Sequence, residues 1–312
     1  MRLMNEGMNR PTVSVVLATY NGERFLPEQL ASLAAQSRRP DRLVLRDDGS
    51  TDQSVALVQT WAAQQGVALQ QVSGPRLGPA RSFLTALHAA EPADIFFFCD
   101  QDDVWLPDKI ARALALLPWG EAAAPTLYAS RLEVVDAQLQ PLRLSALPGR
   151  LSFASASCES LLTGCTMAFN AAFRARLVRV LPQQLVMHDW WCYLLATGLQ
   201  GAALQFDAAP TLRYRQHSAN TLGAGPTGLA ALSARLRRFM GRDSAMRSRQ
   251  LQEFAQLYSA ELTPQASALL AQLLAAKQGW GPRWRAALTA PLHRQTALAT
   301  LTTRLALLTN RF

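Results

Sequence analysis

The chain has 312 residues, of which 49% are hydrophobic and 17% are charged. This composition is too apolar for a disordered chain, and no uncharged apolar run is long enough to cross a bilayer, which excludes the disordered and polytopic membrane classes. The net charge of +9 lies in the last part of the chain, because residues 1–225 hold 19 basic and 19 acidic side chains whereas residues 226–312 hold 12 and 3. This basic segment indicates an anionic partner surface.

The N-terminus and the cysteines indicate in which cellular compartment the protein is expected. Met1–Arg10 contains no apolar stretch of the kind found in signal peptides, so secretion by that route is not expected. The four cysteines form no C-x-x-C pair and no metal-ligand spacing; they are Cys99, Cys158, Cys165 and Cys192. We therefore expect reduced cysteines and a cytoplasmic protein.

The first hundred residues alternate between strand and helix patterns. Four segments predict strands: Val13–Ala18 and Ile95–Cys99 are continuous apolar runs, and Leu43–Leu45 and Val67–Val72 are the second and third strands between them. The segments between them carry apolar residues at helical spacing, and Ser50 or Thr51 is expected to N-cap the helix that contains Trp61. This order predicts a right-handed parallel α/β sheet.

The pattern is less regular after residue 108. The sequence predicts, in order, a helix at Lys109–Leu117, a strand at Thr126–Val135, a long loop at 137–157, a turn and strand within Leu161–Asn170, a helix from His188 to about Thr197 and a short strand at Thr211–Arg215. Residues 223–228 are typical of a linker. Residues 229–312 are predicted to be helical, with apolar stripes that include Leu229–Phe239 and Leu251–Tyr258, and with Thr263-Pro264 capping a further helix.

Acidic clusters follow two of the predicted strands. Asp47-Asp48 follows the second strand, and Asp100, Asp102 and Asp103 follow Ile95–Cys99. Ligands bind at the carboxyl edge of an open α/β sheet, and a divalent cation would relieve the repulsion among the three later carboxylates. Asp47-Asp48 could equally form a plain β-turn that caps a helix.

Several motifs together resemble a known family. They are Val13–Gly22, Arg46–Asp52, Asp100–Lys109, Thr163–Asn170, His188–Trp191 and Tyr214–Ser218. In this order they resemble glycosyltransferase family 2, and the combination is similar to its rhamnosyltransferase-like members. The resemblance covers roughly residues 12–222.

The resemblance implies an inverting enzyme of the GT-A fold, an α/β fold with a central, mostly parallel sheet flanked by helices, followed here by a helical C-terminal tail. It implies a glycosyltransferase domain at 1–222, with a nucleotide-binding half at about 12–110 and an acceptor-binding half at about 111–222. The expected donor is a dTDP- or UDP-linked sugar, rhamnose or another hexose, used with Mn²⁺ or Mg²⁺. The expected acceptor is a glycan or a lipid-linked saccharide in the synthesis of cell-surface polysaccharide.

The resemblance also implies roles for individual residues. Nine of them would bind the nucleotide sugar: Ala18, Thr19, Tyr20, Asn21, Asp47, Asp48, Arg81, Asp100 and Gln101. Asp102 and His217 would hold the metal, and Asp189 would be the catalytic base. An inverting transfer needs such a carboxylate to take the proton of the acceptor hydroxyl.

Three aromatic or imidazole side chains beside Asp189 are open to two interpretations. His188, Trp190 and Trp191 could bind the acceptor, since sugar C–H faces pack well on indole rings and His188 could orient the base. Alternatively His188 is a solvated residue at a helix start and one of the tryptophans belongs to the core. His217 could likewise be a structural histidine instead of a metal ligand.

The basic tail has three interpretations: a solvated helical face, a cationic surface that rests on anionic lipid, or an oligomerisation arm. The second would make the protein peripheral at the inner face of the membrane. A nucleic-acid partner is not expected, because residues 1–225 carry no net charge.

Other functions are less consistent with the motifs. A sugar nucleotidyltransferase would need a glycine-rich loop with a basic residue after the first strand, and Thr19–Glu23 does not provide one. A dehydrogenase is disfavoured because no G-x-G-x-x-G follows Ala18. A non-catalytic nucleotide-binding protein remains the alternative to an enzyme.

Overall fold

The computed structural model describes residues 10–217 and 242–312. The predicted linker at 223–228 and the Leu229–Phe239 stripe lie outside these described residues. The described elements run, in order, β1(Val13–Thr19), α1(Leu26–Ala34), β2(Arg42–Asp47), α2(Ser54–Gln65), β3(Ala68–Val72), α3(Pro79–Ala89), β4(Ile95–Cys99), β5(Val104–Trp105), α4(Lys109–Leu116), β6(Thr126–Val135), β7(Pro141–Leu144), α5(Phe153–Ala156), β8(Ala168–Asn170), α6(Ala171–Leu177), α7(His188–Gly198), β9(Ala203–Arg215), α9(Arg242–Tyr258), α10(Pro264–Ala275), α11(Trp280–Thr289) and α12(Ala297–Leu308).

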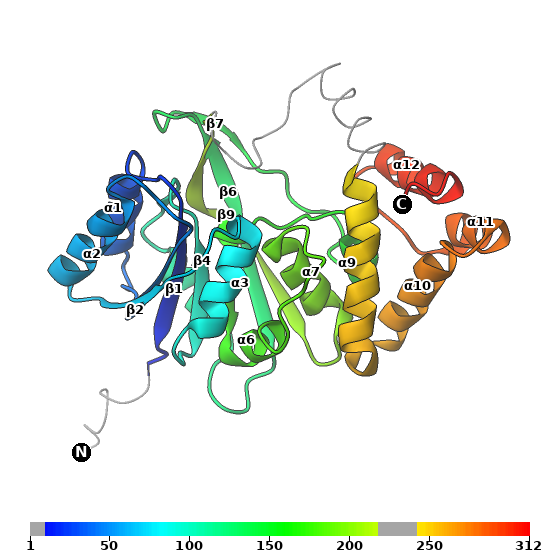
Figure 1. The fold of residues 1–312 in the computed structure, drawn as a ribbon, viewed down its shortest axis with the longest axis horizontal. Helices are drawn as coiled ribbons and strands as arrows, with labels where there is room; N and C mark the ends of the chain where they lie inside the picture. Colours follow the sequence, from blue (N-terminus) through cyan, green and yellow to red (C-terminus); the bar gives the residue numbers. More distant parts are fainter. Residues whose placement is uncertain (1–9, 218–241) are drawn as a thin grey trace.

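These strands form a mixed sheet in the order β3-β2-β1-β4-β8-β6-β9-β5, and β7 pairs with β6. The four N-terminal strands are parallel, whereas β8 runs antiparallel to both β4 and β6. The predicted α/β sheet with flanking helices and C-terminal helices is therefore confirmed, and Figure 1 shows the helices on both sides of it.

Alternating side chains of the parallel strands enter two separate cores. Val15, Leu17 and Phe97 pack with α1, α2 and α4 on one face. Val16 and Phe98 pack with α3 and α7 on the other face. Because β1, β2 and β4 are buried on both faces, their centres are apolar runs, which made them recognisable in the sequence, whereas β3 at the edge of the sheet is half-buried.

Three local expectations were wrong. The helix α2 begins at Ser54 and not after Ser50 or Thr51, because the Ser50 hydroxyl is engaged by Asp47 within the preceding turn. The expected loop at 137–157 contains β7 and the short helix α5. The last strand, β9, spans Ala203–Arg215 because it pairs with β6 along most of that strand, so the predicted Thr211–Arg215 is only its end.

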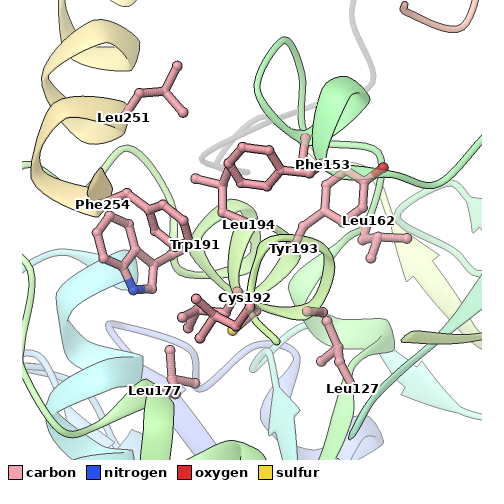
Figure 2. Close-up of a cluster of buried hydrophobic side chains, with 14 of the residues drawn as sticks. Leu127, Phe153, Leu162, Leu177, Trp191, Cys192, Tyr193, Leu194, Leu251 and Phe254 are labelled. Atoms are coloured by element: carbon pink, nitrogen blue, oxygen red, sulfur yellow. The ribbon is translucent and has the colours of Figure 1, made fainter. Parts of the chain in front are cut away.

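The C-terminal helices share the core of the sheet. Leu251, Phe254 and Tyr258 of α9 are buried, as the stripe predicted, and the Phe254 ring meets Trp191 of α7 edge-on with centroids 5.3 Å apart. Figure 2 shows this contact, with α9 lying against α7. Thr263 caps α10 as predicted, since its side chain accepts a hydrogen bond from the Ala266 amide. Within the described ranges, no helix combines the length and the apolar character needed to cross a bilayer.

This packing predicts that α9 stabilises the fold of the sheet and α7. Phe254→Ala should lower the free energy of unfolding by about 3–5 kcal/mol, because Phe254 is fully buried and its loss leaves a cavity against Trp191. Met246→Ala on the same helix is the matched control; Met246 is 44% exposed, so its change should stay within about 0.5 kcal/mol. Urea unfolding followed by circular dichroism measures both, and equal losses for the two variants would contradict the assignment.

Candidate active site

A cavity of about 270 Å³ opens at the carboxyl edge of β1, β2 and β4. Nine of the predicted site residues line it: Ala18, Thr19, Tyr20, Asp48, Asp100, Gln101, Asp102, His188 and Asp189. Asn21, Asp47, Arg81, Trp190, Trp191 and His217 are outside its lining. Segments far apart in the sequence thus converge on one cavity, as expected for the edge at which an open α/β sheet binds ligands.

One end of the cavity is formed by the turn after β1. The Tyr20 amide donates to Gln101 Oε1 at 2.8 Å, which ties this turn to the acidic segment after β4. The Arg76 guanidinium lies over the Tyr20 ring, 3.8 Å from its centroid, and also lines the cavity. Arg76 was not identified from the sequence, where Arg81 was taken as the basic residue. Arg81 instead donates to the Gln183 carbonyl, away from the cavity.

Asp48 holds the loop that carries Arg76. Its carboxylate accepts hydrogen bonds from the Leu77 and Gly78 amides and from the Ser82 hydroxyl, at 2.7–2.8 Å. Burial by itself would raise the pKa of Asp48, but these bonds outweigh it and the pKa lies below the usual value. Gly78 has a φ of 76°, a left-handed conformation that suits glycine, and this directs its amide to the carboxylate.

Asp47 and Asn21 hold the neighbouring turns. Asp47 accepts from the Gly49 and Ser50 amides, as well as from the Thr19 hydroxyl at 3.0 Å. The Asn21 side chain accepts from the Thr51 amide at 2.9 Å. These bonds are those of the β-turn alternative, so Asp47 and Asn21 shape the cavity edge without lining it.

The carboxylates after β4 point in different directions. Asp102 Oδ2 lies 2.8 Å from His217 Nε2, so the two predicted metal ligands are adjacent. Asp100 lines the cavity, and burial, followed by the charges of Asp102 and Asp189, raises its pKa to about 7. Asp103 is fully buried and accepts from the Arg215 amide, so it faces the interior instead.

A buried lysine that the sequence analysis did not single out lies beneath this cluster. Lys109 is fully buried at the start of α4, and its Nζ donates to the Cys165 carbonyl at 2.9 Å. Burial lowers its pKa to about 8, while the charges of Asp103 and Asp100, among others, oppose that fall. A lysine in the first turn of a largely apolar helix, next to Ile110, was the available signal. Its charge offsets part of the repulsion among the acidic side chains.

Among the side chains at this edge of the sheet, Asp102 and His217 are the most suitable ligands for a divalent cation. A carboxylate suits Mn²⁺ and Mg²⁺, and an imidazole next to it favours Mn²⁺ over Mg²⁺. Asp100, Asp103 and Cys165 also offer ligand atoms within 4.8 Å of one another. However, a thiol is a soft ligand that suits Mn²⁺ and Mg²⁺ poorly, and Asp103 faces the interior, so that group is a poor site for these cations.

Asp189 is held rigidly at the start of α7. Its carboxylate accepts from the Gly164 amide at 3.1 Å and from the Trp190 amide at 2.6 Å. Burial raises the pKa of Asp189 to about 6, against the effect of these hydrogen bonds. A carboxyl group with a pKa close to neutral is well suited to exchange protons with a hydroxyl.

His188 is buried between aromatic rings at the same cavity. It lies against Phe83, with ring centroids 4.4 Å apart, and burial lowers its pKa to about 3, so the imidazole is neutral. A Cβ at Gly164 would come within 2.4 Å of His188 Nε2, so only glycine allows this approach. Among the described residues, neither ring nitrogen has a hydrogen-bond partner, and the expectation of a solvated histidine was wrong.

The two tryptophans after Asp189 differ in burial, and one of them belongs to the core. Trp191 is fully buried against Phe254 and Tyr258, so it cannot contact a sugar and belongs to the core (Figure 2). Trp190 is half-buried and donates from Nε1 to the Ala156 carbonyl at 2.6 Å. The physical reason is α9, which covers the face of α7 that carries Trp191.

Comparisons with known proteins show similarity to glycosyltransferases. Residues 14–181 match Glycosyl transferase family 2. The chain is 25% identical over 218 residues to the dTDP-rhamnosyl transferase RfbG of Shigella flexneri, covering 67% of this chain and 74% of RfbG. It is 26% identical over 218 residues to an uncharacterized glycosyltransferase of Nostoc sp., covering 67% of this chain and 66% of that protein.

Similarity to solved structures supports the fold. The crystal structure of S. aureus TarS 1–349 in complex with UDP-GlcNAc has a TM-score of 0.54 to this structure, at 15% sequence identity, covering 96% of this chain and 91% of that one. The family match extends over more than half of the chain and includes β1, β2 and β4, whose ends bear the acidic cavity. The chain belongs to glycosyltransferase family 2.

Proposed function

We propose that the protein is an inverting glycosyltransferase that transfers a sugar, rhamnose in our preferred assignment, from a dTDP- or UDP-linked donor to a hydroxyl of a glycan or lipid-linked saccharide. The observation that carries the proposal is that Asp189, with its raised pKa, lines the same cavity as Asp100 and Asp102. The preference for rhamnose and dTDP is supported by the similarity to RfbG of Shigella flexneri.

The charges in the cavity support a metal-dependent donor. Four carboxylates and one guanidinium line it: Asp48, Asp100, Asp102 and Asp189, with Arg76. A diphosphate would be repelled by this balance unless a cation accompanied it. Asp102 and His217 would hold Mn²⁺ or Mg²⁺, which when bound would neutralise the charge of the leaving diphosphate. The Arg76 guanidinium, which lies over the Tyr20 ring, would supply a second positive charge to the diphosphate of the donor.

Asp189 would act as the general base. Its carboxylate takes the proton of the acceptor hydroxyl while the hydroxyl oxygen bonds to the anomeric carbon. The bond from that carbon to the diphosphate oxygen breaks on the opposite face, so that the nucleoside diphosphate leaves and the configuration inverts. The Gly164 and Trp190 amides hold the carboxylate in place for this step. His188 packs behind this carboxylate with both ring nitrogens buried, so we assign it a positioning role beside Asp189.

The base assignment predicts that Asp189→Asn lowers kcat by about 10²–10⁴-fold, because the amide cannot accept the proton. Binding of the nucleotide, measured by calorimetry, should stay within a few-fold of the wild type. Asp108→Asn, an exposed position outside the cavity, is the control and should keep full activity. A kcat for Asp189→Asn within a few-fold of the wild type would show that another group is the base.

The raised pKa predicts a pH profile. Because the base must be ionised, kcat/KM should be constant well above pH 6 and fall tenfold per unit below it, where Asp189 becomes protonated. The measurement is a steady-state rate series in a constant-ionic-strength buffer. An acid limb near pH 4, the range of an unperturbed aspartate, would contradict the role of this buried carboxylate.

The donor and the metal can be tested together by thermal shift. A panel of dTDP- and UDP-linked sugars, each with and without Mn²⁺, should raise the Tm most for the true donor, and only with the cation. At saturating ligand, 100 times Kd, stabilisation of about 2.7 kcal/mol is expected. Asp102→Asn and His217→Gln should each remove the Mn²⁺-dependent part of this shift. Shifts that are identical with and without Mn²⁺ would contradict the metal assignment.

A further inference from the structure

The last two helices expose two apolar stripes. On α11, Trp280, Trp284 and Leu288 follow one another at intervals of four residues and are 71%, 41% and 69% exposed. On α12, Leu298, Leu301 and Leu305 lie on one side and are 65%, 53% and 48% exposed. Six of the fourteen large hydrophobic side chains that are exposed in the described part of the chain therefore lie on these two helices.

These stripes are not the packing faces of the helices. The α11 helix buries Ala286 and Ala287, and α12 buries Ala306 and Leu307. Except for Leu307, the residues buried by these helices are small, and the Trp280 and Trp284 rings pack edge to face on the outside with their centroids 5.7 Å apart. Figure 1 shows both helices at the end of the molecule opposite α1 and α2. On α11 small residues lie inside and large apolar residues outside, which reverses the usual arrangement, and α12 adds three exposed leucines. An exposed face of this kind indicates an interaction site.

The positive charge of residues 262–312 indicates which kind of partner covers the two apolar stripes. Residues 262–312 contain six basic side chains and no acidic one. Arg294 pairs with Glu159, whereas Arg285, next to Trp284, and Arg311, just after α12, are exposed. No hydrogen bond or ion pair is recorded for either of these two side chains within the described ranges. Tryptophan and leucine on one side of a helix, with arginine beside them, are typical of helices that lie in the interface of an anionic bilayer.

We propose that α11 and α12 form a docking surface for an anionic phospholipid bilayer. The Trp280, Trp284 and Leu288 stripe and the α12 leucines enter the headgroup region, and Arg285 and Arg311 contact the phosphates. Two copies of the chain facing each other through this surface would bring like charges together, so the charge favours a lipid over a second copy. The surface is separate from the cavity and does not depend on the proposed reaction.

Co-sedimentation of the full-length protein with vesicles tests the proposal. We expect binding to vesicles of phosphatidylcholine mixed with phosphatidylglycerol, and much weaker binding to phosphatidylcholine alone. Trp280→Ser with Trp284→Ser should weaken the partition roughly 20-fold by removing the apolar contact. Arg285→Gln with Arg311→Gln should weaken it about 25-fold, since each cation near an anionic surface contributes about fivefold, and added salt should weaken wild-type binding similarly.

Two matched variants control for general changes in surface. Trp119→Ser with Leu116→Ser removes an exposed tryptophan and leucine elsewhere, and Arg39→Gln with Arg143→Gln removes two exposed cations elsewhere. Both should bind vesicles like the wild type. Thermal unfolding of all variants verifies the fold, which should be kept because the changed side chains are at the surface.

Three results would overturn the proposal. The first is no sedimentation with anionic vesicles, and the second is sedimentation that the Trp280 and Trp284 changes leave unaltered. The third comes from light scattering: a wild-type mass twice that of the chain, reduced to a single chain by the same two changes, would assign the surface to a second copy. Loss of binding in both α11–α12 variants, with retention in both controls, supports the lipid surface.

Discussion

The structure depends on a concentration of carboxylates at one edge of an apolar sheet. Asp48, Asp100, Asp102 and Asp189 surround a cavity in which Arg76 is the one basic side chain with a permanent charge among the lining residues. Such a cluster is unfavourable unless charges or hydrogen bonds compensate it. The protein provides part of the compensation itself, through Lys109 beneath the cluster and the backbone amides that bind Asp48 and Asp189. A bound cation with its diphosphate ligand would supply the rest of the charge compensation that the carboxylates need.

The two cores of the sheet position these groups. The parallel strands β1, β2 and β4 are buried on both faces, so their ends are fixed relative to one another. The opposite side of the cavity comes from α7, which is held between the sheet and α9. Asp189 is therefore ordered by contacts on both sides of its helix, the Gly164 amide from within the cavity and the Trp191–Phe254 contact from behind.

The C-terminal region accordingly has two different parts. The α9 helix and α10 complete the core, as the burial of Phe254 and Leu270 shows. The α11 and α12 helices bury mostly small residues and expose large ones, together with uncompensated positive charge. The basic C-terminal region thus combines a part that completes the core, α9 and α10, with a part that exposes apolar and basic side chains, α11 and α12.

Local patterns in the sequence determined the central strands, the helix that starts at His188, the Thr263 cap and the acidic edge with Asp100 and Asp102, whereas Asp189 was named only through the family resemblance. They did so because strand burial, capping and chain order are properties of consecutive residues. Only the tertiary structure decided between Trp190 and Trp191, because α9 lies about 60 residues further along the chain and covers the face of one of them. The same holds for the presence of Arg76 and Asp48 in the cavity lining, from which Arg81 and Asp47 are absent, since the loop of Leu77 and Gly78 folds back onto the Asp48 carboxylate. Such contacts join residues that are distant in the chain, and no local periodicity encodes them.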